Sequence, residues 1–87
     1  MKNKVLVKLI VPEIDEVFDI FIPVNEIMWK IKKMILKCVN DISGCDMNLD
    51  LDYVLLKKTN SRIYNNNEIV INTDIRNGAE LLIIKNS

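Results

Sequence analysis

The most constraining feature of the chain is a single amphipathic stretch, in a sequence whose other apolar segments alternate like β-strands. Apolar residues recur in this stretch in steps of three and four, the spacing of one face of an α-helix. The stripe consists of Ile27, Ile31, Met34, Ile35, Cys38, Val39 and Ile42. A chain with one such helix must pack it against a sheet, so the sequence predicts an α+β fold.

Both ends of this stretch carry residues typical of helix caps. Asn25 is expected to be the N-cap, because its side-chain oxygen can accept an early helical N–H. Val24 would then pack one turn further in as a hydrophobic staple. Gly44 suits the position after the last turn, because glycine adopts a left-handed backbone without steric cost. The predicted helix runs from about Asn25 to about Ser43.

Two β-rich segments precede the helix and predict a hairpin. Val5–Val11 ends at Pro12, and Val17–Ile22 ends at Pro23. Alternate residues of a strand face opposite sides, and Lys8 marks the solvent side of the first strand. The residues expected to face the core are Val5, Val7, Leu9 and Val11, followed by Phe18, Ile20 and Ile22.

The second half predicts further strands and tight turns. Tyr53–Lys58 is the expected third strand, and we favour the phase that turns Tyr53 and Leu55 inward. Arg62–Tyr64 is expected to be a short fourth strand. Residues 69–75 form an irregular crossover, Asn77-Gly78 is a turn, and Ala79–Lys85 is the last strand. Within the last strand, Leu81 and Ile83 face opposite to Leu82 and Ile84.

The order hairpin, helix, short strands and final strand predicts a β-grasp domain, a mixed sheet of four to five strands with one helix on one face. The first and last strands are expected side by side at its centre, because both are apolar on both faces. The segment 69–84 resembles the closing segment of ubiquitin-like domains, in which Val70, Ile75 and Leu81 would be core anchors.

Among ubiquitin-like proteins, the chain looks most like the YukD-like family, free-standing bacterial proteins that accompany type VII (ESX-type) secretion machinery in Gram-positive bacteria. This resemblance implies a cytoplasmic accessory protein that docks on secretion components. Conjugated modifiers and sulfur carriers need a C-terminal Gly-Gly, whereas this sequence ends Ile83-Ile84-Lys85-Asn86-Ser87. We therefore expect a non-conjugating protein; a modifier or sulfur carrier made as a precursor is the alternative.

Composition limits the class of function. The 87 residues include 12 basic and 12 acidic side chains and no histidine. No nucleic-acid partner is expected without net positive charge, and the usual proton-transfer group and metal ligand are missing. Only two cysteines, no apolar run near the ~20 residues that span a bilayer, and no signal peptide favour the cytoplasm. We expect one domain over residues 1–87, with no cofactor, no membrane insertion and no enzymatic activity.

The helix can cover only one face of the sheet, and strand phase places an apolar set on the other. This set consists of Leu6, Ile10, Phe21, Leu82 and Ile84. Large exposed apolar patches mark interaction sites, and ubiquitin-like domains typically bind partners through this face. The prediction is a protein-interaction surface. A homodimer, which would make the chain a self-associating structural domain, and cover by loops are the alternatives.

The helix offers a second surface. Lys30, Lys32, Lys33 and Lys37 make one face basic, which is either simply solvated or docks an acidic partner. Trp29 lies off the apolar stripe, where it either caps the open end of the core or acts as a satellite anchor.

Two further features have structural explanations. Asp46–Asp52 superficially resembles a calcium loop, but Leu51 and Lys57 stand where such loops need Gly and Glu. A solvated linker with its apolar residues turned inward is the favoured interpretation. Cys38 lies on the helix stripe as a small hydrophobe, and Cys45 follows the helix without a histidine or third cysteine to complete a reactive or metal site.

Overall fold

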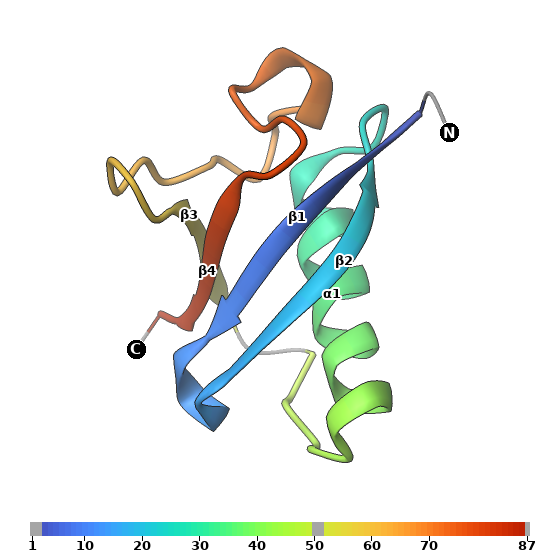
Figure 1. Ribbon diagram of the computed structural model, residues 1–87, viewed down its shortest axis with the longest axis vertical. Helices are drawn as coiled ribbons and strands as arrows, with labels where there is room; N and C mark the ends of the chain where they lie inside the picture. Colours follow the sequence, from blue (N-terminus) through green and yellow to red (C-terminus); the bar gives the residue numbers. More distant parts are fainter. Residues whose placement is uncertain (1–2, 50–51, 87) are drawn as a thin grey trace.

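The computed structural model describes residues 3–49 and 52–86, and in them four strands form a sheet with one long helix on one of its faces (Figure 1). Two short 3-10 helices lie in the connections. In chain order the elements are β1 (Lys4–Val11), η1 (Pro12–Ile14), β2 (Glu16–Pro23), α1 (Met28–Ser43), β3 (Tyr53–Lys57), η2 (Val70–Asn72) and β4 (Glu80–Lys85). Each strand limit lies within one residue of the sequence prediction.

The sheet has the strand order β2-β1-β4-β3. β1 pairs antiparallel with β2 and parallel with β4, and β3 pairs antiparallel with β4. The first and last strands therefore lie at the centre, as predicted. Figure 1 shows α1 packed across one face of this sheet, with the opposite face turned toward the viewer. This is the predicted α+β, β-grasp arrangement, with four strands.

The core lies between α1 and the inward face of the sheet. The predicted phase is confirmed in all four strands, including the inward orientation of Tyr53 and Leu55 in β3. Val5 and Phe18 are partly buried against this core. The fully enclosed strand residues are Val7, Leu9, Val11, Ile20, Ile22, Tyr53, Leu55, Leu81 and Ile83. Val70 and Ile75 of the crossover are buried with them, as the ubiquitin-like pattern implied.

The helix begins three residues later than predicted, and Asn25 is not its cap. Ile27 occupies the N-cap position without a side-chain hydrogen bond. The backbone N–H of Met28 instead donates to the carbonyl of Glu68 (2.8 Å), and that of Trp29 donates to the carbonyl of Asn66 (3.2 Å). Because a distant loop satisfies these first-turn donors, a local capping residue is not needed.

The buried stripe of α1 is also rotated from the prediction. Ile31, Ile35 and Val39 are buried as expected, and Cys38 is partly buried. However, Met34 is 38% exposed and Ile42 61% exposed, whereas Met28 and Leu36 are buried. Leu36 lies beside Leu49 and Tyr53, so the segment after the helix covers a flank that the sequence pattern left open.

Arg62–Tyr64 does not form the predicted fourth strand. Ile63 makes only an isolated bridge with Leu56. On either side of it, the N–H of Lys57 donates to the carbonyl of Arg62, and the N–H of Tyr64 donates to the carbonyl of Leu55. The pairing goes no further than this bridge, and the Tyr64 side chain next to it turns into the core, where it is 2% exposed.

The helix ends as predicted. Gly44 is the C-cap with φ of 75°, a left-handed backbone that glycine adopts without strain, and its N–H donates to the carbonyl of Asn40. The Asn40 side chain then holds the backbone of Met47 at both its N–H (2.8 Å) and its carbonyl (2.9 Å). This contact turns Met47 inward, as expected for the linker; Leu51 lies outside the described residues.

Candidate protein-interaction surface

All five residues predicted from the sequence project from the sheet face opposite α1, which we call the outer face. The register aligns Leu6 with Phe21, and Ile10 with both Val17 and Leu82. Phe21 is 61% exposed, Leu6 39% and Ile84 38%, whereas Ile10 and Leu82 are half-buried by their neighbours. Strand geometry alone therefore brings these side chains together on one surface.

One apolar row crosses the whole sheet. Leu82 of β4 is aligned with Ile10 of β1 on one side and with Leu56 of β3 on the other. The row consists of Leu56, Leu82, Ile10 and Val17, and we call it the apolar row. Ile63 extends it beyond Leu56 and is 60% exposed. Ile63 was not foreseen, because it was assigned to a regular strand rather than to the rim of this surface.

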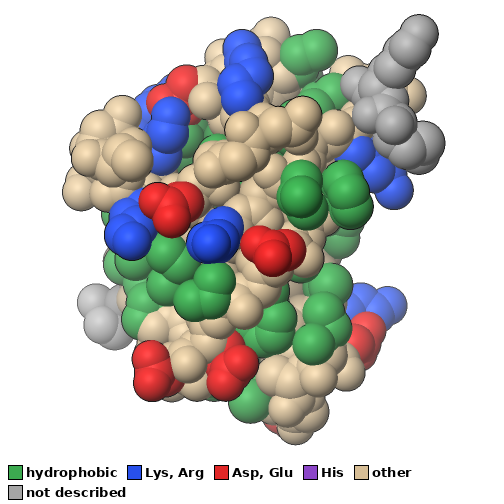
Figure 2. Space-filling model, in the orientation of Figure 1, with side chains coloured by type: hydrophobic (Ala, Val, Ile, Leu, Met, Phe, Trp, Pro, Cys, Tyr) green, Lys and Arg blue, Asp and Glu red, His purple; other side chains and the backbone are tan. Residues whose placement is uncertain are grey.

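A row of charges divides the outer face. Lys8 of β1 is aligned with Asp19 of β2 and with Glu80 of β4. The N–H of Lys58 donates to the carbonyl of Glu80 (2.9 Å), which places Lys58 at the end of the row. We call Lys58, Glu80, Lys8 and Asp19, in this spatial order, the charged row. Figure 2 shows blue and red side chains alternating across this face, with green side chains on both sides.

The charged row separates the five predicted residues into two groups. Leu6 and Phe21 lie on one side of it, and Ile10, Leu82 and Ile84 lie on the other. Strand phase places Lys8 and Asp19 on this face, but their alignment with each other and with Glu80 depends on the register between strands, which is not visible in local periodicity. The outer face is thus two apolar areas joined by a polar band.

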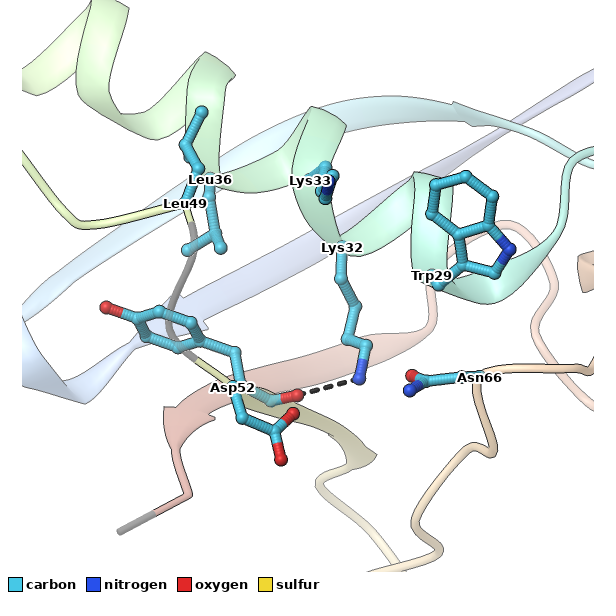
Figure 3. Close-up of a pocket in the computed structure, with 8 residues that line it drawn as sticks. Trp29, Lys32, Lys33, Leu36, Leu49, Asp52 and Asn66 are labelled. Carbon is cyan, nitrogen blue, oxygen red and sulfur yellow. Dashed lines mark hydrogen bonds between the residues drawn. The ribbon is translucent and has the colours of Figure 1, made fainter.

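The basic face of α1 borders a separate hollow of about 300 Å³. Figure 3 shows Lys32 extending from α1 across this hollow, where its Nζ donates to the backbone carbonyl of Tyr53 (2.7 Å). Burial lowers the pKa of Lys32, and the nearby Asp52 carboxylate opposes that shift. The Lys32 side chain is therefore partly buried and fixed by a hydrogen bond, whereas Lys30, Lys33 and Lys37 are exposed.

Trp29 stands at the edge of this hollow and is 42% exposed. The Nζ atoms of Lys30 and Lys33 lie 5.5 and 5.8 Å from the centre of its ring, within reach of a cation–π interaction. Lys30 also lies 3.9 Å from the Glu26 carboxylate, which is four residues earlier in the chain. Such exposed contacts are weak, so they organise the side chains more than they stabilise the fold.

A separate cluster of polar side chains, centred on Asp74, connects two segments of the chain. Asp74 accepts hydrogen bonds from Tyr64 (2.7 Å), Arg62 (3.0 Å) and Lys57 (3.2 Å). The bond from Tyr64 is the main reason that the pKa of Asp74 is lowered to about 2, and Lys57 and Arg62 act in the same direction. Burial, reinforced by Asp74, raises the pKa of Tyr64. The cluster ties the loop after β3 to the segment before β4.

The remaining candidates from the sequence show no arrangement that suggests chemistry. Cys38 and Cys45 are both free thiols. In residues 3–49 and 52–86, no group of three or more acidic, cysteine or histidine side chains is placed to hold a metal ion. Across the same residues, no helix is long and apolar enough to cross a membrane.

Comparison with known proteins gives likeness in structure only. No family model and no curated protein matches the chain. Among solved structures, it is similar to a chain of the MycP5-free ESX-5 inner membrane complex, with a TM-score of 0.77 and 15% identity. That match covers 98% of this chain but 22% of the other, so the chain spans less than a quarter of that relative.

Two further similar structures are ubiquitin-like by name. The N-terminal ubiquitin-like domain of the 4931431F19Rik protein matches with a TM-score of 0.68 and 19% identity, over 98% of this chain and 77% of that one. The ubiquitin of Caldiarchaeum subterraneum matches with a TM-score of 0.66 and 12% identity, over 97% and 95%. These likenesses confirm the ubiquitin-like β-grasp fold predicted from the sequence.

Proposed function

We propose that the chain is a non-conjugating, ubiquitin-like accessory component of a bacterial type VII secretion system, which works in the cytoplasm by binding proteins rather than by catalysis. The observation that carries this proposal is the outer face. Its apolar row crosses all four strands, while the helix covers only the opposite side of the sheet. The ubiquitin-like fold itself supports a role in protein interaction.

The pattern of the outer face favours a protein partner over a small ligand. Apolar side chains lie on both sides of the charged row, which crosses the face between them. Protein interfaces likewise combine apolar side chains with polar and charged ones. A flat surface buries little of a small molecule, whereas small-molecule sites are concave.

Two observations support the secretion system as the setting. The chain looks most like the YukD-like family among ubiquitin-like proteins, and Val70, Ile75 and Leu81 occupy the core positions that its resemblance to ubiquitin-like domains implied. The fold is also similar to part of a chain from an ESX-5 inner membrane complex. Both observations are likenesses, so the proposal needs a direct test in the host.

The test is complementation of a strain that lacks the gene. Leu82→Ser combined with Ile84→Ser removes two apolar side chains from the outer face, and we expect both this variant and the deletion to reduce the amount of secreted substrate at least tenfold. The matched control is Ile42→Ser, which changes an equally apolar residue that is 61% exposed on α1. The measurement is the quantity of small secreted substrates in the culture medium, with circular dichroism to establish that each variant folds.

Normal secretion by the folded double variant would contradict the role of the outer face, and normal secretion by the deletion strain would contradict the secretion function. The same strains test conjugation. Protein recovered under denaturing conditions should have only the mass of the free chain, and a covalent adduct would support the modifier alternative instead.

A further inference from the structure

The charged row has a symmetry that its individual residues do not reveal. From β3 to β2 it consists of Lys58, Glu80, Lys8 and Asp19, so the charges alternate in sign across four strands. When such a row is reversed end to end, every positive position falls on a negative one. The row is therefore complementary in charge to the row of a second copy, when that copy is rotated so that its row runs in the opposite direction.

Two copies can place their outer faces together around a two-fold axis that lies between the two sheets. This axis can run parallel to the strands or perpendicular to them. When the axis runs parallel to the strands, between β1 and β4, Lys8 of one copy faces Glu80 of the other. Asp19 of one copy then faces Lys58 of the other. An axis across the strands, along the charged row, places each charge opposite its own copy and is repulsive. Only the first orientation is electrostatically favourable, so the row selects one geometry and rejects the other.

The apolar side chains agree with the same axis. It places Ile10 opposite Leu82, and Val17 opposite Leu56, so the apolar row packs on itself. On the other side of the charged row, Leu6 is brought opposite Gly78, whose N–H donates to the carbonyl of Leu6 within each chain.

Gly78 has no side chain, so it leaves room for the Leu6 side chain of the second copy. The strands of the two copies would run in the same direction, as in the aligned class of face-to-face sheet packing.

We propose that the outer face binds a second copy of this chain in an isologous dimer around this two-fold axis. The inference rests on the proposed function only in taking the same face as the interaction surface. A secretion component that uses this face would compete for it with the second copy.

The area of the face sets the strength of this dimer. Four strands about 4.8 Å apart and four rows of outward side chains about 6.6 Å apart give a surface of roughly 500 Å². This is below the ~800 Å² that each partner contributes to a standard stable interface. The dimer is therefore weak, and the fraction of dimer increases with protein concentration over the micromolar range and above.

The experiment uses charge exchange at the centre of the row. Lys8→Glu and Glu80→Lys should each prevent dimer formation, because each places like charges opposite one another at both central contacts. An equimolar mixture of the two variants should dimerise again, since every central contact then joins a Glu to a Lys. The double variant Lys8→Glu/Glu80→Lys should dimerise alone. Molar mass by light scattering, from about 10 µM to about 1 mM, follows these states across the affinities expected of a small interface.

The mixture separates dimer contacts from effects within one chain. Lys8 and Glu80 are aligned within the same sheet, so each single variant also has like charges side by side, and mixing does not remove that repulsion. Recovery of the doubled mass can come only from contacts between chains. Circular dichroism establishes that both single variants fold, and Lys33→Glu on α1 is the control that should leave the dimer unchanged.

A wild-type mass that stays monomeric over the whole range overturns the inference, and so does a dimer that the single variants leave intact. Neither result touches the proposed function, which stands or falls on secretion by the Leu82→Ser/Ile84→Ser strain. Conversely, a charge-dependent dimer with normal secretion in that strain would support the inference and contradict the role proposed for the face in secretion.

Discussion

At the scale of single residues, Asp74 links more parts of the chain than any side chain on the outer face. Its carboxylate accepts from Lys57 in β3, and from Arg62 and Tyr64 in the loop that follows. Arg62 also donates to Glu68 (2.6 Å), which in turn accepts from the backbone N–H of Asn65 (2.7 Å). The long connection between β3 and β4 is thus held by charge-assisted hydrogen bonds in place of a regular strand.

The first prediction concerns the pH dependence of this cluster. Because the pKa of folded Asp74 is about 2, below its ordinary value of 3.8, its stabilisation is fully present above about pH 4 and is lost as the pH falls toward 2. Asp74→Asn should lower the free energy of unfolding by about 1–2 kcal/mol at pH 7. The difference between variant and wild type should shrink toward zero near pH 2.

Urea denaturation at a series of pH values measures this difference. Asp41→Asn, at an exposed position of α1, is the matched control and should change stability by less than about 0.5 kcal/mol. A difference for Asp74→Asn that stays constant between pH 7 and pH 2 would show that the carboxylate charge is not what stabilises the loop.

The sequence did not reveal this cluster, because its members are spread from Lys57 to Asp74 with no periodic relation. The same limit applies to Asn25. A cap residue was the reasonable local expectation there, but the chain pairs residues 24–27 with residues 69–71, as in the bond from the N–H of Ile71 to the carbonyl of Val24 (2.8 Å). Contacts over such separations are invisible to local patterns.

At the scale of elements, β4 contributes side chains both to the core and to the outer face. Leu81 and Ile83 point inward and are 0% exposed, whereas Leu82 and Ile84 point to the outer face. The period of two in a strand therefore separates core side chains from outer-face side chains along six consecutive residues.

The second prediction follows from these two faces. Ile83→Ala should lower the free energy of unfolding by about 3 kcal/mol, because it removes buried methyl groups and leaves a cavity. Ile84→Ala, which changes the same residue type at 38% exposure, should lower it by less than about 1 kcal/mol. Chemical denaturation at low protein concentration measures both, since there the monomer dominates. Equal losses would contradict the assignment of the two faces.

The sequence predicted the strands better than the helix for a physical reason. A strand residue has two choices, inward or outward, and one fixed side chain such as Lys8 determines the phase of a whole strand. A helix can rotate about its own axis by much less than the half-turn that separates the two faces of a strand. Which flank of the helix is buried therefore depends on the elements packed beside it. Leu36 is buried because Leu49 and Tyr53 cover that flank, which the apolar stripe could not show.

At the scale of the whole molecule, the strand order could be predicted because apolar content on both faces marks a central strand. The five outer-face residues also followed from phase alone. What phase could not provide was the alignment of one strand with another, and the charged row exists only in that alignment. The fold was therefore predictable to the level of faces, while the pattern within a face required the structure.

The parallel pairing of β1 with β4 also has a consequence for the synthesis of the protein. The ribosome makes β1 first and β4 last of the strands, so the centre of the sheet stays open until Ile83 has left the exit tunnel. Until then the hairpin and α1 expose part of the apolar surface that β4 covers in the folded chain, and nascent chains in this state are prone to aggregation. A stalled or truncated chain would display that surface, which gives quality-control proteases a simple signal for its removal.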